Sequence, residues 1–153
     1  MDKQSKGSTD SSQKILKVDQ SLFVAFKKGI ITKDYIMGKP LGSGSFGTVR
    51  VATHKATNQT RAIKIIKKAD QDQEKFFLEV DILTKLSHPN IMRIFEFYED
   101  SKHFYIVSEL CSGGELFEKI SEKGQFTEKE AAQLMKQIIS AIVYSHSNHI
   151  VHR

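Results

Sequence analysis

An α+β fold is predicted, because strand-like and helix-like stretches occupy different parts of the chain. Up to residue 108, five short runs rich in β-branched and aromatic residues flank a single stretch with helical periodicity. Ser112-Gly113-Gly114 then interrupts the pattern, and helical periodicity resumes after it. We therefore expect a sheet-and-helix unit over residues 35–108, a connection over 109–114, and the first helices of a helical unit over 115–153.

Turn-forming residues separate the expected strands. These five strands cover residues 35–42, 48–54, 61–67, 94–98 and 104–108. The helix between the third and fourth strands is expected over 73–86, since its apolar residues recur at intervals of three and four. They are Phe76, Phe77, Val80, Leu83 and Leu86. His88-Pro89-Asn90 ends this helix, because proline disfavours helical dihedral angles in the residue before it.

Two helices are expected after the glycine pair. The first covers residues 115–123. The second begins at Thr127, whose hydroxyl can cap a backbone N–H while the Glu130 carboxylate reaches back to the cap. Its apolar stripe consists of Ala131, Leu134, Met135, Ile138 and Ile142. We expect the rest of a helical lobe to bury this stripe, and the apolar face to be exposed in these 153 residues alone. Residues 149–153 are expected to leave this helix as a strand.

Residues 1–34 form an extension ahead of the first expected strand. Residues 1–14 consist mostly of Ser, Lys, Gln, Asp and Gly. We expect them to be disordered, because they offer too little apolar surface to fold. Residues 15–31 contain more apolar side chains. They could dock on the rest of the chain or on a partner, and the sequence leaves both options open.

Composition narrows the class of protein. The 153 residues suit one ordinary domain, and Cys111 alone cannot form a disulfide within the chain, which fits a reducing cytoplasm. No apolar run reaches the roughly 18 residues that a membrane span needs. The N-terminus lacks an apolar signal-peptide core, and Asp2 excludes the N-myristoylation pattern. We therefore expect a cytoplasmic protein with no membrane partner.

The net charge of +5 is concentrated near the N-terminus. Residues 1–39 contain eight lysines and four aspartates, so the rest of the chain is nearly neutral. A basic polar tail of this kind is usually solvated, and we expect no nucleic-acid partner.

A glycine-rich segment between the first two expected strands carries the clearest functional signal. It reads Leu41-Gly42-Ser43-Gly44-Ser45-Phe46-Gly47-Thr48-Val49, and Lys64 follows on the third strand. Glycines let backbone N–H groups approach an anion, since no Cβ blocks the way. A lysine on the neighbouring strand adds a point charge. Together they predict a site for the phosphates of a nucleotide.

Other interpretations of the glycines fit less well. A dinucleotide-binding fingerprint needs a helix directly after the loop and an acid about 20 residues later, where Lys67 stands. A P-loop needs Lys followed by Ser or Thr after its last glycine, but Thr48 follows Gly47. The remaining alternative is a Gly/Ser-rich turn with a surface lysine. We interpret Lys67 and Lys68 as solvated ends of the strand.

These motifs make the sequence resemble the eukaryotic protein kinases from about residue 35 to residue 153. Arg61-Ala62-Ile63-Lys64 matches the lysine tetrad, and Glu79 follows Lys64 by fifteen residues, where the family has its helix glutamate. Residues 105–116 resemble the hinge between the lobes, and His152-Arg153 resembles the start of the H-R-D catalytic loop. The hinge and long-helix sequences are similar to those of the calcium/calmodulin-regulated group, in particular the calcium-dependent protein kinases of plants and protists.

The resemblance implies a small lobe with a five-stranded antiparallel sheet and one helix, followed by the first helices of a truncated helical lobe. It also implies that the binding site encloses adenine between Leu41, Val49 and Ala62. Backbone groups of Glu109 and Cys111 would form hydrogen bonds with the edge of the adenine.

The resemblance assigns the phosphates to the glycine-rich segment and to Lys64, which Glu79 would orient. Ser108 would gate a pocket behind the adenine, and Glu115 would contact the ribose or a basic residue of a substrate peptide. The implied reaction is phosphoryl transfer from ATP to Ser or Thr hydroxyls of a protein. ATP and Mg²⁺ are the implied cofactors.

Several parts of the implied machinery lie beyond Arg153: the catalytic aspartate, the metal-binding asparagine and the D-F-G segment. We expect no metal ligands within the 153 residues, and no efficient phosphate transfer by them. Calcium or calmodulin regulation would require segments that are not present. One hypothesis is the N-terminal part of a Ser/Thr kinase, and the alternative is a catalytically dead nucleotide-binding or regulatory interaction module.

Three other candidate sites are set aside. His146, His149 and His152 do not share one helix face, which argues against a zinc site. The segment from Asp70 begins like a calcium loop but lacks the glycine that the sharp turn requires. Cys111 has no histidine placed to activate it, so we expect a packing residue of the hinge and not a nucleophile.

Overall fold

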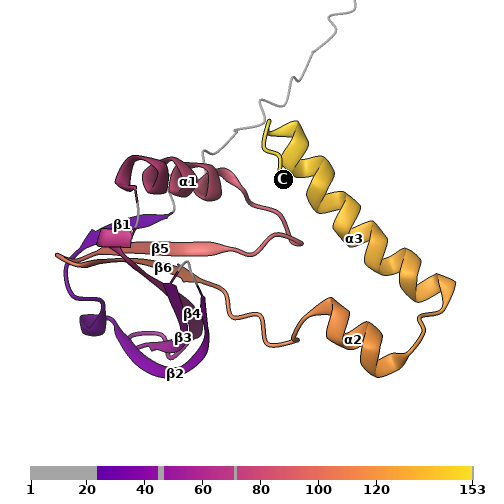
Figure 1. Ribbon diagram of the computed structural model, residues 1–153, viewed down its shortest axis with the longest axis horizontal. Helices are drawn as coiled ribbons and strands as arrows, with labels where there is room; N and C mark the ends of the chain where they lie inside the picture. Colours follow the sequence, from indigo (N-terminus) through magenta and orange to yellow (C-terminus); the bar gives the residue numbers. More distant parts are fainter. Residues whose placement is uncertain (1–23, 45–46, 71, 153) are drawn as a thin grey trace, which may run out of the picture.

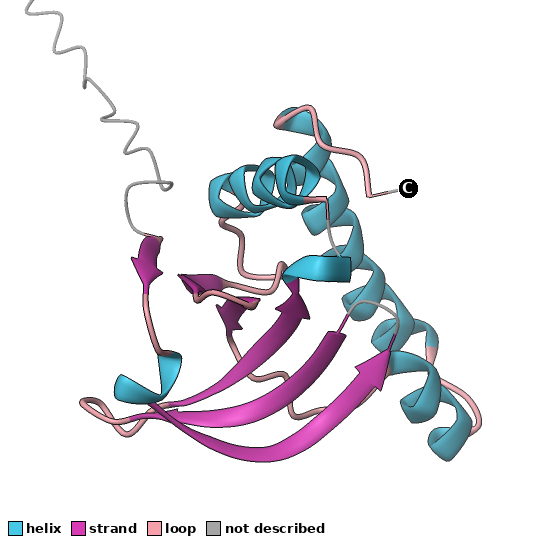
Figure 2. Cartoon of the chain, turned by 60° about the vertical axis from the view of Figure 1, so that its left-hand side comes forward, coloured by secondary structure: helices cyan, strands magenta, loops and turns pink. Residues whose placement is uncertain are grey.

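The computed structural model describes residues 24–44, 47–70 and 72–152. A single curved sheet with α1 packed on it precedes two further helices, and the longer of these stands apart from the strands in Figure 1 (Figure 2 shows the same elements from another side). The strands are β1 (Ala25–Lys28), β2 (Tyr35–Gly44), β3 (Gly47–His54), β4 (Thr60–Lys67), β5 (Ile94–Glu99) and β6 (His103–Ser108). The helices are α1 (Gln73–Lys85), α2 (Leu116–Lys123) and α3 (Glu128–Ser147), with short 3-10 turns η2 (Ile31–Lys33) and η3 (Lys68–Asp70). The predicted disorder of residues 1–14 lies outside the described residues.

The predicted α+β class is confirmed, and the sheet has one strand more than expected. Its order is β1-β5-β6-β4-β3-β2, and the five predicted strands pair antiparallel to one another. The additional strand, β1, pairs parallel with β5, so the sheet is mixed and not purely antiparallel. Part of the apolar stretch at 15–31 therefore docks on the chain itself. By doing so it covers a sheet edge whose backbone groups would otherwise be unpaired.

Alternation along the strands, interrupted by register shifts in β2 and β5, gives the sheet two different apolar faces. One face holds a buried cluster of Ile31, Tyr35, Ala52, Ile63, Tyr98, Tyr105 and Val107. The opposite face packs against α1 through a second cluster of Ile66, Phe76, Val80, Ile94, Phe97 and Phe104. Phe104 is fully buried and stacks on Phe76 of α1, with 4.2 Å between the ring centroids.

Local sequence signals explain where α1 begins and ends. The carboxylate of Asp72 accepts hydrogen bonds from the backbone N–H groups of Glu74 and Lys75, which makes Asp72 the N-cap. The predicted helix is confirmed, although Leu86 lies just beyond its last residue. Of the predicted apolar stripe, only Phe76 and Val80 are buried.

The two later helices form as predicted. Thr127 and Glu130 make the expected reciprocal cap at the start of α3. The expected exposure of the apolar α3 face is confirmed for the described residues, since none of its residues is buried and Met135, Ile138 and Ile142 are exposed. No described element covers this face. No helix among the described residues has both the length and the apolar composition of a membrane span.

Polar contacts attach α3 to the connection between α1 and β5, which extends toward the helix in Figure 1. The backbone N–H of Ser87 donates to the Tyr144 hydroxyl at 3.0 Å, and the His88 imidazole lies 2.9 Å from the Ser140 hydroxyl. The side-chain amide of Asn90 donates to Gln137 of α3 at 3.2 Å.

The predicted strand after α3 is wrong for residues 149–152, which pair with no described strand. His149 has a positive φ of 61°, and Val151 is 64% exposed. An extended segment needs a partner for its backbone groups before it counts as a strand, and β propensity alone does not supply one.

A polar network attaches β1 to the sheet on the face away from α1. The Lys27 ammonium lies 2.9 Å from the Glu96 carboxylate, 3.3 Å from the Asp34 carboxylate and 2.9 Å from the Tyr98 hydroxyl. Tyr98 also donates to Asp34 at 2.6 Å, and Tyr35 donates to Glu96 at 2.7 Å. These five side chains come from β1, β2, β5 and the turn that precedes β2.

The network holds both carboxyls in their charged form. Hydrogen bonds from Tyr98 and Lys27 keep the pKa of Asp34 below its usual range. Burial would raise the pKa of Glu96, but hydrogen bonds from Lys27 and Tyr35 lower it more, so its pKa also lies below its usual range. Since both folded-state pKa values are lowered, the contribution to stability is present above the unfolded values near pH 4. It is lost as the pH falls through the lower folded values.

We expect Lys27→Met to reduce the free energy of unfolding by about 1–2 kcal/mol at pH 7, after allowing for partial solvent screening of the charges. The deficit should narrow as the pH falls below about 4, because the carboxyls then protonate in wild type. Urea unfolding at pH 7 and pH 3 measures it. Lys28→Met is the matched control on the same strand, and a deficit that does not change with pH would contradict the proposed ionic origin.

Candidate functional site

The glycine-rich segment forms the tip of the β2–β3 hairpin, where Gly44 pairs with Gly47. Gly47 has a φ of +113°, and a Cβ there would lie 2.1 Å from the carbonyl oxygen of Ile65. A Cβ on Gly42 or Gly44 would meet nothing within 4 Å. The glycines thus serve two purposes: Gly47 lets the hairpin pack on β4, whereas Gly42 and Gly44 leave the backbone accessible. Ser45 and Phe46 lie outside the described residues.

Strand register gathers four predicted site residues on one face of the sheet. Val49 of β3 lies opposite Lys64 of β4, and Ala62 of β4 lies opposite Ser108 of β6. Directly opposed residues in antiparallel strands point to the same side, and alternate residues along β4 do so as well. Ile63, between Ala62 and Lys64, is fully buried on the other face.

Lys64 and Glu79 reach the same cavity, which has a volume of about 150 Å³ and lies between β4, β6 and α1. Its lining consists of Lys64, Ile66, Phe76, Glu79, Val80, Leu83 and Ile106. Most of the wall is apolar, which strengthens electrostatic interactions inside it. An ammonium and a carboxylate at one largely apolar cavity can orient each other and can bind an anionic group at its mouth.

The two lysines after Lys64 have different surroundings. Lys67 is exposed, as predicted. The interpretation of Lys68 as a solvated strand end is wrong, because its ammonium lies 2.7 Å from the Glu99 carboxylate and 4.9 Å from the centre of the Phe104 ring. The Lys68 side chain is only 18% exposed. Its partner comes from a hairpin about thirty residues away, so spacing along the chain could not reveal it.

The predicted adenine and ribose contacts lie at the end of β6 and in the segment after it, and they do not share one cavity as Lys64 and Glu79 do. Ser108 is buried, and its hydroxyl donates to the Glu109 carbonyl oxygen at 3.3 Å. The backbone N–H of Glu109 donates to the carbonyl oxygen of Arg93 at 2.9 Å. Cys111 is predicted to be a packing residue of the hinge, and this is wrong: the side chain is exposed, because the chain leaves the sheet there. Glu115 is the N-cap of α2.

Leu41 is also exposed, at 49%, on β2. It lies at an irregularity between Pro40 and Gly42 in the β2–β3 ladder. Neither Leu41 nor Cys111 nor Glu115 lines the cavity shared by Lys64 and Glu79. The structure therefore brings Lys64 and Glu79 to one cavity and places Val49 and Ala62 on the same sheet face, whereas Leu41, Cys111 and Glu115 lie away from that cavity.

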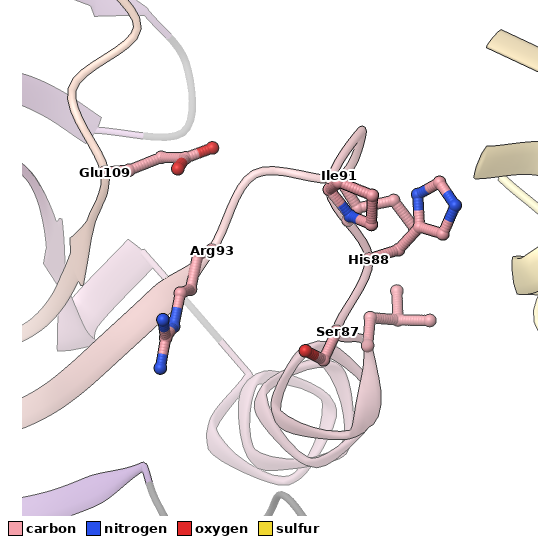
Figure 3. Close-up of a pocket in the computed structure, with 7 residues that line it drawn as sticks. Ser87, His88, Ile91, Arg93 and Glu109 are labelled. Atoms are coloured by element: carbon pink, nitrogen blue, oxygen red, sulfur yellow. The ribbon is translucent and has the colours of Figure 1, made fainter. Parts of the chain in front are cut away.

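A second hollow of about 240 Å³ lies between the α1–β5 connection and the segment after β6, and sequence reasoning did not identify it (Figure 3). Ser87, His88 and Ile91 line it from the connection, and Glu109 projects toward it from the segment after β6 (Figure 3). Arg93 lines it at the approach to β5. Only Glu109 belongs to the predicted site.

The segment from Asp70, which resembles the start of a calcium loop, takes on a structural role. Asp70 ends η3 and Asp72 caps α1. Within the described ranges, no three His, Cys, Asp or Glu side chains form a group suited to a metal ion.

The sequence matches the protein kinase domain family over residues 35–153. It is 49% identical to calcium-dependent protein kinase 5 of Plasmodium berghei over 114 residues, which cover 74% of this chain and 20% of that protein. It is 40% identical to calcium-dependent protein kinase 4 of Plasmodium falciparum over 141 residues, or 90% of this chain and 27% of that protein. A probable myosin light chain kinase of Dictyostelium discoideum is 43% identical over 122 residues, covering 78% and 31% of the two chains. The chain thus spans between a fifth and a third of the length of these relatives.

Proposed function

The chain belongs to the protein kinase family, and we propose that residues 35–153 are the ATP-binding part of a Ser/Thr protein kinase. The observation that carries this proposal is the shared cavity of Lys64 and Glu79. The cavity opens on the same sheet face as Val49 and Ala62, beside the glycine hairpin. Family membership alone would not assign these side chains to a nucleotide.

The phosphates fit the charge and the backbone of this region. Gly42 and Gly44 leave space for an anion to approach the backbone, and Lys64 supplies hydrogen-bond donors and a positive charge. Glu79 orients the Lys64 ammonium from α1, and this ion pair belongs to the active arrangement of protein kinases. Mg²⁺ would neutralise charge on the phosphates when bound, but its ligands in the family motif are not among these 153 residues.

The adenine would lie against the apolar face formed by Val49 and Ala62, with Leu41 closing over it. The N–H of Glu109 already donates to Arg93, and its carbonyl oxygen accepts from the Ser108 hydroxyl. That oxygen has a second lone pair, which would accept a hydrogen bond from adenine. The Cys111 backbone would contact the same edge. Glu115, at the start of α2, would contact the ribose or a basic residue of the substrate.

Residues 1–153 should therefore bind ATP but transfer phosphate to no protein efficiently. Titration calorimetry with ATP and Mg²⁺ tests the binding, and a radiolabelled-phosphate assay with a basic Ser/Thr peptide tests the transfer. A transcript that continues past codon 153 with Asp-Leu-Lys-Pro would identify the chain as part of a longer kinase. Absence of nucleotide binding by the 153 residues would contradict the proposal.

Two of the relatives are named as calcium-dependent protein kinases. If this chain shares that property, the calcium-binding segments lie outside residues 1–153. The only segment in them that begins like a calcium loop supplies the cap of α1 instead. Calcium titration of residues 1–153, followed by circular dichroism, should show no response.

We expect Ser108→Met to weaken binding of an ATP-competitive pyrazolopyrimidine with a bulky aromatic group by roughly 10- to 100-fold, because overpacking a filled space costs about 1–3 kcal/mol. Ser108 is 7% exposed and lies opposite Ala62, so a longer side chain would occupy the space behind the adenine. Inhibitor titration measures the effect. Ser108→Ala is the control and should keep the affinity, while unchanged affinity in Ser108→Met would exclude the gating role.

A further inference from the structure

We propose that β1, which precedes the matched kinase segment, positions α1 and hence Glu79 through the side chain of Phe26. This inference rests on the proposed nucleotide site, because Glu79 matters there as the partner of Lys64. Its structural part, the support of α1 by β1, can be tested without nucleotide.

The first observation is that β1 is built into the sheet. It runs parallel to β5 with Ala25 opposite Glu96 and Lys28 opposite Glu99. The backbone N–H of Gly29 extends the ladder by donating to the Glu99 carbonyl oxygen at 2.8 Å. In Figure 1, β1 lies beside β5 and beneath α1.

The second observation is that β1 contacts α1 just before Glu79, and that the residue before β1 packs against the cluster beneath the helix. The Phe26 ring lies 5.9 Å from the Phe77 ring, two residues before Glu79. Val24 packs against the cluster beneath α1 and lines a small cavity with Leu83, four residues after Glu79. A helix supported at both of these points cannot rotate or shift without losing these contacts.

The third observation is that the buried support of α1 is confined to a few residues. Of its thirteen residues only Phe76 and Val80 are buried, and Glu79 itself is exposed. Phe77 lies 5.5 Å from the Phe104 ring of the sheet on one side and meets Phe26 on the other. Most helical stability in proteins comes from the packing of an apolar face, so the Phe26–Phe77 contact adds to the support that Phe76 and Val80 give to α1.

The Lys27 network fixes the register that this contact requires. Phe26 lies opposite Phe97, which belongs to the cluster under α1, and Lys27 lies opposite Tyr98 on the other face. A shift by one residue would turn Phe26 away from α1 and bring Lys27 toward it. The ionic contacts of Lys27 with Glu96 and Asp34 oppose that shift.

Phe26→Ala in the 153-residue chain tests the inference with two readouts. In hydrogen exchange without nucleotide, the amides of α1 should exchange about tenfold faster, while those of β3 and β4 stay unchanged. In titration with ATP and Mg²⁺, affinity should fall about three- to tenfold. Phe26→Leu should restore most of both. Ile30→Ala, which removes a 60%-exposed side chain just after β1, is the matched control and should change neither.

Each other outcome counts against the proposal. Unchanged exchange in α1 would show that Phe26 does not support the helix. A uniform increase across all strands would show a general structural role. Faster exchange in α1 with unchanged ATP affinity would remove the link to Glu79. If the wild type bound no ATP, the proposed function would fail, and the exchange measurement would still decide whether β1 supports α1.

Discussion

Replacing Lys64 by methionine should weaken the binding of ATP and Mg²⁺ about 10- to 100-fold. Methionine keeps an unbranched apolar stem but removes the charge, and hydrogen bonds that involve a charged group contribute about 1.5–3 kcal/mol. Lys64 lies opposite Val49 and lines the cavity that Glu79 also lines, so its loss removes the positive charge next to the glycine hairpin. Isothermal titration calorimetry on the 153-residue chain measures the change.

Lys67→Met is the matched control, since Lys67 is an exposed lysine on the same strand and has the same chemistry. It should leave the affinity for ATP unchanged. Equal losses from the two substitutions would overturn the assignment of Lys64. A loss in neither would mean that phosphate binding does not depend on β4. Thermal unfolding of both variants checks that they fold like the wild type.

The second large effect is expected on stability. Gly47→Ala should lower the free energy of unfolding by about 3 kcal/mol, which corresponds to a fall in Tm of roughly 10 °C. The φ of +113° is unfavourable for alanine, and its Cβ would lie 2.1 Å from the Ile65 carbonyl oxygen. The hairpin tip can relieve this contact only by moving off β4. Scanning calorimetry measures the loss.

Gly42 and Gly44 provide the contrast. Gly42→Ala meets no atom within 4 Å and should leave stability unchanged or raise it slightly, by reducing the freedom of the unfolded chain. Gly44→Val should likewise unfold near the wild-type temperature, yet weaken ATP binding, because its side chain stands where a phosphate would approach. If Gly47→Ala melted like Gly42→Ala, the close contact with Ile65 would not require glycine.

Most of the fold could be predicted because its signals are local. Alternating apolar runs predicted five strands, and each is present within about two residues of its expected ends. The reciprocal cap of Thr127 and Glu130 set the start of α3. Asp72 is also recognisable as an N-cap from the sequence, since it directly precedes the periodic stretch of α1.

Part of the site could also be predicted. The spacing of the glycines, Ala62, Lys64 and Glu79 predicted that these residues act together, and the structure brings Lys64 and Glu79 to one cavity. Their roles in nucleotide binding stay predictions. Periodicity could not predict which apolar stripe finds a partner. The stripes of α1 and α3 look alike in sequence, but only that of α1 meets the sheet.

The sequence by itself determined the strands, the helices, their caps and the glycine hairpin, because each depends on neighbouring residues and on the conformations that those residues allow. Only the tertiary structure decided that β1 joins the sheet and that Lys68 pairs with Glu99. These outcomes depend on contacts between residues distant in the chain. Their energies arise from burial and charge pairing, which no local pattern records.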